Sequence, residues 1–188
     1  MLSLVIPAFS VSMELKNITL NCIESFRPYV DEVIVSDDSD IYWRDLHHAS
    51  DQYLLHPRMG YTKNLNMGWR LARGEYVLHA SGDCRLIAGN PLDLCIPNTV
   101  TSPRVQAVES DPPRGNLSGA CFLAPKSVTD KIGMMDVGVD WNNNPDLEYF
   151  GRLKNHSIPT VVIQDVIVSH AAASPGPFVL SKDMYKGR

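Results

Sequence analysis

The chain has 188 residues, of which 44% are hydrophobic and 20% charged, and its formal net charge is -4. A chain of this length and composition is expected to fold as a single globular domain with a sizeable core. Its lysines and arginines are scattered rather than gathered into a basic stripe, which argues against nucleic acid as a major partner.

The four cysteines have neither the spacing of a zinc site nor a CxxC redox motif. Cys22 lies at an apolar helical position and Cys121 in a strand-like run, so both are predicted to be buried thiols. The opening run MLSLVIPAFS is short, lacks a basic flank and contains a proline, so it predicts a strand and not a signal peptide. No segment approaches the length of a membrane span, and we therefore expect a cytoplasmic, soluble protein.

The first half of the chain alternates predicted strands and helices. Residues 2–8 (LSLVIPA) predict a buried strand, and a helix is predicted from Ser12 to Pro28. Its apolar face is formed by Leu15, Ile18, Cys22, Ile23 and Phe26. Strands are predicted at 32–36, 52–55 and 75–80, and a second amphipathic helix over 60–74, closed by Gly74. Because the longer strands are continuous apolar runs, the expected fold class is α/β, a mostly parallel sheet flanked by helices.

The second half is less regular. Residues 92–104 predict a loop with a short helical turn, 105–110 and 119–125 predict strands, and 126–133 predict a short helix. A helix over 144–157 has Pro145 in its first turn, and residues 160–170 predict one or two strands that end at His170. Residues 171–188 are rich in Pro, Gly and Ser and predict a mobile tail or lid.

Carboxylates follow two of the predicted strands. Asp37 and Asp38 come after the strand at 32–36, and Asp83 follows the strand at 75–80 in the stretch VLHASGDCRL. Ligands of parallel α/β sheets bind beyond the carboxyl ends of the strands, so these side chains are expected at one edge. Asp83 has two interpretations at this point, an ordinary Gly-Asp turn residue or a metal ligand.

Six segments occur in the order found in the family 2 glycosyltransferases: LSLVIPAFS, DEVIVSDDSD, GYTKNLNMGWRLARGEYVLHASGDC, GACFLAPKSVTDKIGMMD, NPDLEYFGRLKNHSIPTVVI and VIVSH. From Leu2 to about His170 the chain resembles these GT-A fold enzymes, which use nucleoside-diphosphate sugars. The resemblance implies one domain over 1–170, with a nucleotide-binding half (1–90) and an acceptor half (91–170).

Three positions depart from the family pattern. Ser81 stands where the first Asp of the Asp-x-Asp metal motif is expected, so only Asp83 remains of that motif. Pro145 replaces the Glu of the family's Glu-Asp pair, and Ser10 replaces the usual Asn of the first turn.

The resemblance implies a divalent cation, Mn2+ or Mg2+, with Asp83 as the main ligand and His170 as the second. Such an ion neutralises the diphosphate leaving group and keeps water and phosphate oxygens in its shell, so one or two protein ligands suffice. An imidazole ligand favours manganese. The alternatives are a turn residue for Asp83 and a solvent-facing strand end for His170.

By the same resemblance, Asp146 is the candidate catalytic base that takes the proton of the acceptor hydroxyl. Glu148 is the fallback, on another side of the same helix. The alternative is structural, because an acidic residue in the first turn of a helix is favoured by the helix dipole.

Nucleotide recognition is assigned to the ends of the first two predicted strands. The backbone of Pro7, Ala8 and Phe9 is expected to line the base pocket, and Asp37, ahead of Asp38, to accept hydrogen bonds from the base or ribose. Further candidates for contacts with the donor are Arg58, Asn64, Ser81 and, with a weaker claim, Lys63. The alternatives are an Asx turn in DDSD and a solvated surface cation at Arg58.

Trp141 and the run Asn142, Asn143 and Asn144 precede the candidate base and are suited to sugar recognition, by ring stacking and amide hydrogen bonds. The alternative is a polar loop with one buried tryptophan. Asn66 and Gly68 are expected to serve backbone geometry and helix packing.

The sequence thus predicts a metal-dependent, inverting glycosyltransferase that moves a sugar from a nucleoside-diphosphate sugar to an unidentified acceptor. One alternative is a degenerate copy that binds the nucleotide-sugar without turnover. A sugar nucleotidyltransferase ranks lower, because PAFSVSMELKN lacks the Gly-rich, basic phosphate loop that such enzymes usually have.

Overall fold

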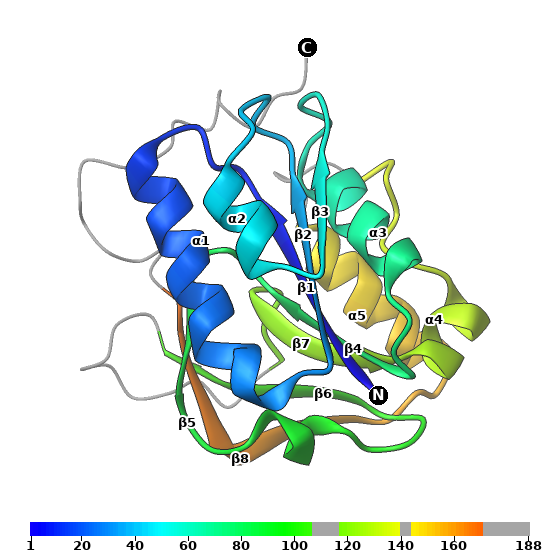
Figure 1. Cartoon of the computed structure of the whole chain (residues 1–188). Coiled ribbons are helices and arrows are strands. Elements are labelled where there is room, and N and C mark those ends of the chain that lie inside the picture. The colour runs from blue at the N-terminus through cyan, green and yellow to red at the C-terminus, as the bar shows by residue number, and fades with distance from the viewer. Residues whose placement is uncertain (107–116, 140–143, 171–188) are drawn as a thin grey trace.

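The computed structural model describes residues 1–106, 117–139 and 144–170. Eight strands form one sheet in the order β3-β2-β1-β4-β7-β6-β8-β5, with helices packed against it (Figure 1). The strands are β1 (Leu2–Ala8), β2 (Glu32–Asp37), β3 (Gln52–Leu55), β4 (Tyr76–Ala80), β5 (Cys84–Ala88), β6 (Val100–Gln106), β7 (Cys121–Pro125) and β8 (Thr160–His170). The helices are α1 (Met13–Phe26), α2 (Arg44–Ala49), α3 (Tyr61–Leu71), α4 (Lys126–Ile132) and α5 (Pro145–Asn155), with the 3-10 turns η1 (Arg27–Tyr29) and η2 (Pro91–Leu94).

The first half of the sheet is parallel, as its continuous apolar strands predict. β1 pairs with β2 and β4, and β2 pairs with β3, all in parallel register. Every residue of β1 and β2 is buried, because helices cover both faces. On one face Leu4 shares a core with Ile23 of α1, and on the other Val5 shares a core with Leu65 of α3. A side-chain carbon at Gly68 would lie 2.5 Å from Val5 Cγ1, so this glycine lets α3 approach β1, the packing role predicted for it.

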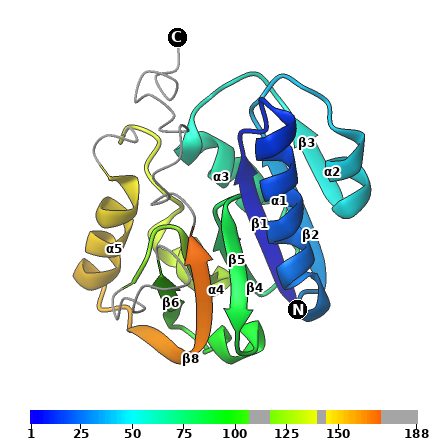
Figure 2. The same ribbon diagram turned by 90° about the vertical axis from the view of Figure 1, so that its left-hand side faces the viewer.

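The second half of the sheet is mixed, so the expectation of a mostly parallel sheet does not extend to it. β7 runs antiparallel to β4 and β6, and β5 runs antiparallel to β8, while β6 and β8 are parallel. Figure 2 shows β5 and β8 side by side. Leu86 N of β5 donates to Ser25 Oγ of α1 (3.1 Å), which ties this edge strand to the first helix.

Several local predictions need correction. The loop predicted through residue 104 is wrong, because β6 already begins at Val100; Pro103 lies inside this strand, next to a shift in its register with β8. Neither α2 nor β5 was predicted, since both are short and lack a clear apolar period. Gly74 does not close α3, which ends at Leu71. Gly74 instead lies against Ser3, whose Oγ would be 2.6 Å from an added side-chain carbon.

The other elements follow the prediction. Ser12 is the N-cap of α1 and accepts a hydrogen bond from Leu15 N (3.2 Å), and Pro145 opens α5. Residues 160–170 form one long strand that ends at His170. Residues 107–110 of the predicted strand, Trp141 with Asn142 and Asn143, and the tail at 171–188 lie outside the described residues.

Candidate active site

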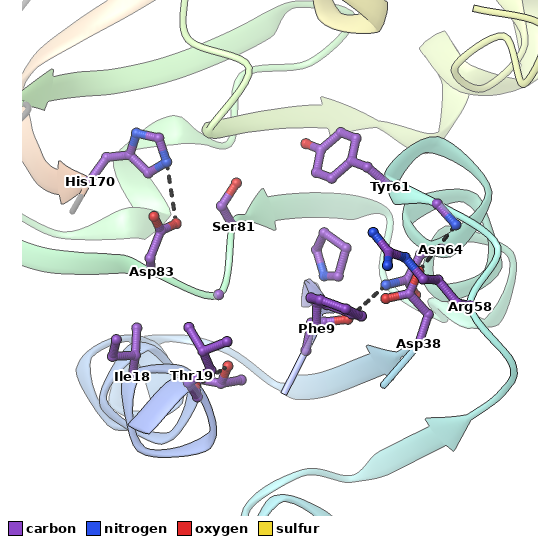
Figure 3. Close-up of a pocket in the computed structure, with 15 residues that line it drawn as sticks. Phe9, Ile18, Thr19, Asp38, Arg58, Tyr61, Asn64, Ser81, Asp83 and His170 are labelled. Atoms are coloured by element: carbon purple, nitrogen blue, oxygen red, sulfur yellow. Dashed lines mark hydrogen bonds and ion pairs between the residues drawn. The ribbon is translucent and has the colours of Figure 1, made fainter. Parts of the chain in front are cut away.

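A cavity of about 200 Å³ lies beyond the carboxyl ends of β1, β2 and β4 (Figure 3). Its lining residues are Pro7, Ala8, Phe9, Leu15, Ile18, Thr19, Asp38, Arg58, Gly60, Tyr61, Asn64, Ser81, Gly82, Asp83 and His170. Most described candidates for donor or metal contacts from the sequence line this cavity. Asp37, Lys63, Asp146 and Glu148 do not line it, and neither does Asn144, the exposed N-cap of α5.

Asp83 and His170 lie together at one side of the cavity (Figure 3). His170 Nε2 is 3.2 Å from Asp83 Oδ1, and the two side chains keep about 27% and 30% of their surface exposed. The sheet brings them together because Cys84, the first residue of β5, pairs with His170, the last residue of β8. A carboxylate and an imidazole from distant parts of the chain therefore face the same space.

Asp83 sits in a turn as well as in the cavity. Cys84 N donates to Ser81 O (2.9 Å), which closes the turn, and Ser81 N donates to Ala120 O (2.8 Å). Gly82 lies against α1, since an added side-chain carbon would be 3.0 Å from Thr19 Oγ1. Asp83 is therefore a turn residue, as one of its two interpretations predicted. The same turn directs its side chain toward the cavity (Figure 3).

Asp38, Arg58 and Phe9 form the opposite side of the cavity (Figure 3). The Arg58 guanidinium carbon lies 4.7 Å from the centre of the Phe9 ring, a cation–π contact. Asp38 Oδ2 accepts from Gly60 N (3.1 Å). Burial raises the pKa of Asp38, against the opposing effect of the backbone hydrogen bonds from Gly60 and Met59. This side of the cavity thus pairs a hydrogen-bond acceptor with a cation.

Asn64 lines the cavity and has an unsatisfied side-chain acceptor. Its side chain is 2% exposed, and its Nδ2 donates to Ala8 O (3.0 Å). Within the described residues, its Oδ1 has no hydrogen-bond partner. Because a buried carbonyl oxygen without a partner is costly, a ligand N–H or O–H group that reached this atom would be stabilised.

Asp37 has a different environment from Asp38. It is fully buried, and its Oδ1 accepts from Ser10 N (3.2 Å) and Ser39 N (3.1 Å). Its Oδ2 accepts from Tyr53 OH (3.1 Å). These bonds hold the loops after β1 and β2. The carboxylate that reaches the cavity is that of Asp38, which the sequence analysis placed second.

Asp146 lies in the first turn of α5, half-buried, next to Gly119 and outside the lining of the cavity. Glu148 instead pairs with Arg152, through Nε (2.6 Å) and Nη2 (3.0 Å). Arg152 also donates to Ile132 O (2.7 Å), so this ion pair connects α5 to α4. The fallback carboxylate is therefore engaged in a structural contact.

Sequence analysis missed two polar side chains near the site, Tyr61 and His79. Tyr61 opens α3 directly after Gly60, whose φ is +85°, and its hydroxyl lies 2.7 Å from His79 Nε2. His79 is fully buried in β4, and burial lowers its pKa to about 4, so its imidazole is neutral near pH 7. The available signal was a histidine inside an otherwise apolar strand.

The sheet and its flanking helices match the GT-A fold of solved structures. No family model and no curated protein matches the sequence. Among solved structures, GalNAc-T7 with UDP, GalNAc and Mn2+ is similar with a TM-score of 0.74 and 13% identity, over 90% of this chain and 43% of that chain. A mannosyltransferase from Pyrobaculum calidifontis, in complex with GDP-Man and Mn2+, has a TM-score of 0.68 and 14% identity, over 93% of this chain and 58% of that chain.

S. aureus TarS (residues 1–349) is similar with a TM-score of 0.66 and 12% identity, over 91% of this chain and 60% of that chain. The chain thus spans about half the length of these structures, and at such low identity the likeness establishes the fold. Among the described helices, none is long and apolar enough to span a membrane.

Proposed function

We propose that this protein is a metal-dependent glycosyltransferase that moves a sugar from a nucleoside-diphosphate sugar to an acceptor hydroxyl with inversion. One observation carries the proposal: Asp83 and His170 meet, 3.2 Å apart, in a cavity that also contains Asp38 and Arg58. This combination suits a ligand with a polar base at one end and a diphosphate at the other. The similar GT-A structures include complexes with UDP or GDP-Man and Mn2+, which supports the proposal.

The nucleotide would occupy the side of the cavity formed by Phe9, Asp38, Arg58 and Asn64. Asp38 and the Asn64 Oδ1 supply acceptors for N–H or O–H groups of the base and ribose. Arg58 supplies positive charge for phosphate oxygens in a protein whose net charge is negative. The apolar side chains of Leu15 and Ile18 line the same cavity from α1.

The donor set of Asp83 and His170 fits a divalent cation. Among the described residues no cluster of three His, Cys, Asp or Glu side chains exists that could hold an ion without other ligands. Mg2+ and Mn2+ sites commonly take one or two protein ligands and complete their shell with phosphate oxygens and water. When bound, the ion would supply charge neutralisation of the diphosphate leaving group.

The transfer itself is a displacement at the anomeric carbon. The acceptor oxygen forms a bond to this carbon while the bond from the carbon to the diphosphate oxygen breaks, and the nucleoside diphosphate leaves with the electron pair. The hydroxyl proton passes to the Asp146 carboxylate, which acts as the general base. Since Glu148 is held by Arg152, Asp146 is the better candidate on α5.

The test is a screen of UDP-, GDP- and TDP-sugars for release of the nucleoside diphosphate, with Mn2+ or with EDTA. We expect slow donor hydrolysis for at least one donor in Mn2+, and its loss in EDTA. Asp83→Ala should abolish the release, while Asp130→Asn, an exposed site on α4, should keep it. Wild-type release by Asp83→Ala in Mn2+ would contradict the metal assignment.

A second candidate is a protein that binds a nucleotide-sugar without turnover, favoured by Ser81 at the first position of the metal motif. Calorimetric titration with UDP, GDP and TDP, with and without Mn2+, separates the two candidates. Metal-dependent binding without any donor hydrolysis would favour this second candidate over the transferase.

A further inference from the structure

Gly119 lies against the carboxylate of Asp146. A side-chain carbon built on Gly119 would be 2.3 Å from Asp146 Oδ2 and 2.6 Å from both its Cβ and its Cγ. Real Cβ atoms essentially never come within 3.0 Å of a heavy atom outside their own stretch of chain. Asp146 can therefore occupy its position only because residue 119 has no side chain.

The backbone of Gly119 is held by the side chains of His79 in β4 and Tyr61 in α3. His79 Nε2 lies 3.0 Å from Gly119 O, and Tyr61 OH lies 3.3 Å from the same oxygen. In the tautomer that carries its hydrogen on Nε2, His79 donates to this carbonyl oxygen. Burial raises the pKa of Tyr61 well above its ordinary value, and Asp146 raises it further, so the hydroxyl remains a donor.

A series of ring contacts connects this pair to the helix that carries Asp146. The Tyr61 and His79 ring centres are 5.9 Å apart, and those of His79 and Phe122 are 5.3 Å apart. Phe122 in turn lies 5.8 Å from Tyr149, which is fully buried in α5, three residues after Asp146. These packed rings fix α5 relative to Tyr61, which lines the cavity.

We infer that Gly119, held by Tyr61 and His79, positions the Asp146 carboxylate beside the donor cavity. Gly119 is a positioning residue. Because it has no side chain, the Asp146 carboxylate has room beside it, and this role requires no contact between Gly119 and the donor or acceptor. The inference rests on the proposed function only where it concerns turnover, because the contact between Gly119 and Asp146 can be tested without a substrate.

The first test is Gly119→Ala. Displacing a reacting group by about 1 Å can cost about 100-fold in rate, so we expect kcat to fall by about 100-fold. Because Gly119 does not line the cavity, the nucleotide Kd should stay within about twofold. The control is Gly151→Ala on α5, where no described atom lies within 4 Å of the added carbon. It should keep wild-type turnover.

A double-mutant cycle with Asp146→Gly separates positioning from general damage. Gly119→Ala should lower the Tm of the wild type by about 5 °C through overpacking, and by much less once Asp146 has lost its side chain. It should also leave the residual turnover of Asp146→Gly unchanged. Equal losses in both backgrounds would overturn the inference. If the wild type transfers no sugar, the proposed function fails, and the Tm cycle alone still decides whether Gly119 seats Asp146.

A second pair of variants covers the case in which Gly119→Ala does not fold. His79→Gln retains a side-chain N–H donor toward Gly119 O, whereas His79→Leu removes it. We expect kcat to fall about tenfold further in His79→Leu than in His79→Gln, with equal nucleotide Kd values. Equal kcat values for the two variants would contradict the role of the Gly119 carbonyl.

Discussion

The two halves of the sheet differ in how they are built and in what they contribute to the site. The parallel half, β3-β2-β1-β4, supplies most of the cavity lining together with its helices: Phe9 and Asp38 lie just after β1 and β2, and Asn64 lies on α3. The mixed half, β7-β6-β8-β5, contributes His170 to the lining, and Gly119, just before β7, packs against Asp146 of α5.

We therefore expect the two halves to have different roles in the proposed reaction. Side chains of the parallel half would bind the nucleotide, and the segment around β7 and α5 would position the proton acceptor. Asp83 and His170 meet at one side of the cavity, where they join the two halves. Variants in the first half should therefore change affinity, variants in the second should change turnover, and Asp83 should affect both.

Asp83→Asn is expected to have the largest effect. It removes the charge that faces His170 and the proposed cation, so turnover should fall by about 1000-fold, and the Mn2+ dependence of nucleotide binding should disappear. Initial rates of nucleoside-diphosphate release and calorimetry measure both. Turnover of Asp83→Asn within tenfold of the wild type would show that the reaction does not need the Asp83 carboxylate.

Asp146→Asn tests the mixed half by itself. We expect kcat to fall by about 100- to 1000-fold, because an amide cannot take the acceptor proton, with an unchanged nucleotide Kd. Glu148→Gln, which weakens the ion pair with Arg152, is the matched control and should keep turnover within about threefold. A loss of nucleotide affinity in Asp146→Asn would break the proposed division between the halves.

Asp37 and Asp38 provide a pair of adjacent carboxylates with different expected effects. Asp37→Ala leaves Ser10 N and Ser39 N without their acceptor and removes one of the two acceptors of the Tyr53 hydroxyl, so the free energy of unfolding should fall by about 3 kcal/mol. Asp38→Ala should lower nucleotide affinity by about tenfold. Urea unfolding measures the stability of the two variants, and calorimetry measures their nucleotide affinity. If Asp37→Ala lost affinity and Asp38→Ala lost stability, the nucleotide-binding role would belong to Asp37.

The smallest expected effect is a decrease in the free energy of unfolding at acidic pH, caused by His79. The unfolded chain takes up a proton on this histidine near its ordinary pKa of 6.5, whereas burial keeps the native imidazole neutral down to about pH 4. The unfolded state therefore binds more protons between these values, and stability falls as pH drops from 6.5 toward 4. At pH 5 the cost is about 2 kcal/mol relative to pH 7.5.

Urea unfolding of the wild type and His79→Gln at pH 5 and 7.5 measures this contribution. The pH-dependent difference should shrink by about 2 kcal/mol in His79→Gln and persist in His156→Gln, an exposed control. An unchanged difference in His79→Gln would mean that His79 titrates alike in both states.

Part of the site could be predicted because it follows directly from strand ends. Asp83 and His170 each lie at or near the end of a strand that can be recognised from its apolar residues. The resemblance to the glycosyltransferase family then implied that both side chains bind one cation. The choice between Asp37 and Asp38 could not be made, because adjacent residues at the end of a strand point in opposite directions. Only the hydrogen bonds from Ser10, Ser39 and Tyr53 show which carboxylate is structural.

By itself the sequence determined the parallel half of the sheet, where α1 and α5 begin, and the set of polar residues at the strand ends. Those features depend on local periodicity and capping, which neighbouring residues encode. The tertiary structure decided the pairing of β5 with β8, the strand through Pro103, and the seating of Asp146 against Gly119. These depend on contacts between segments far apart in the chain, where close packing sets the outcome and local pattern carries no signal.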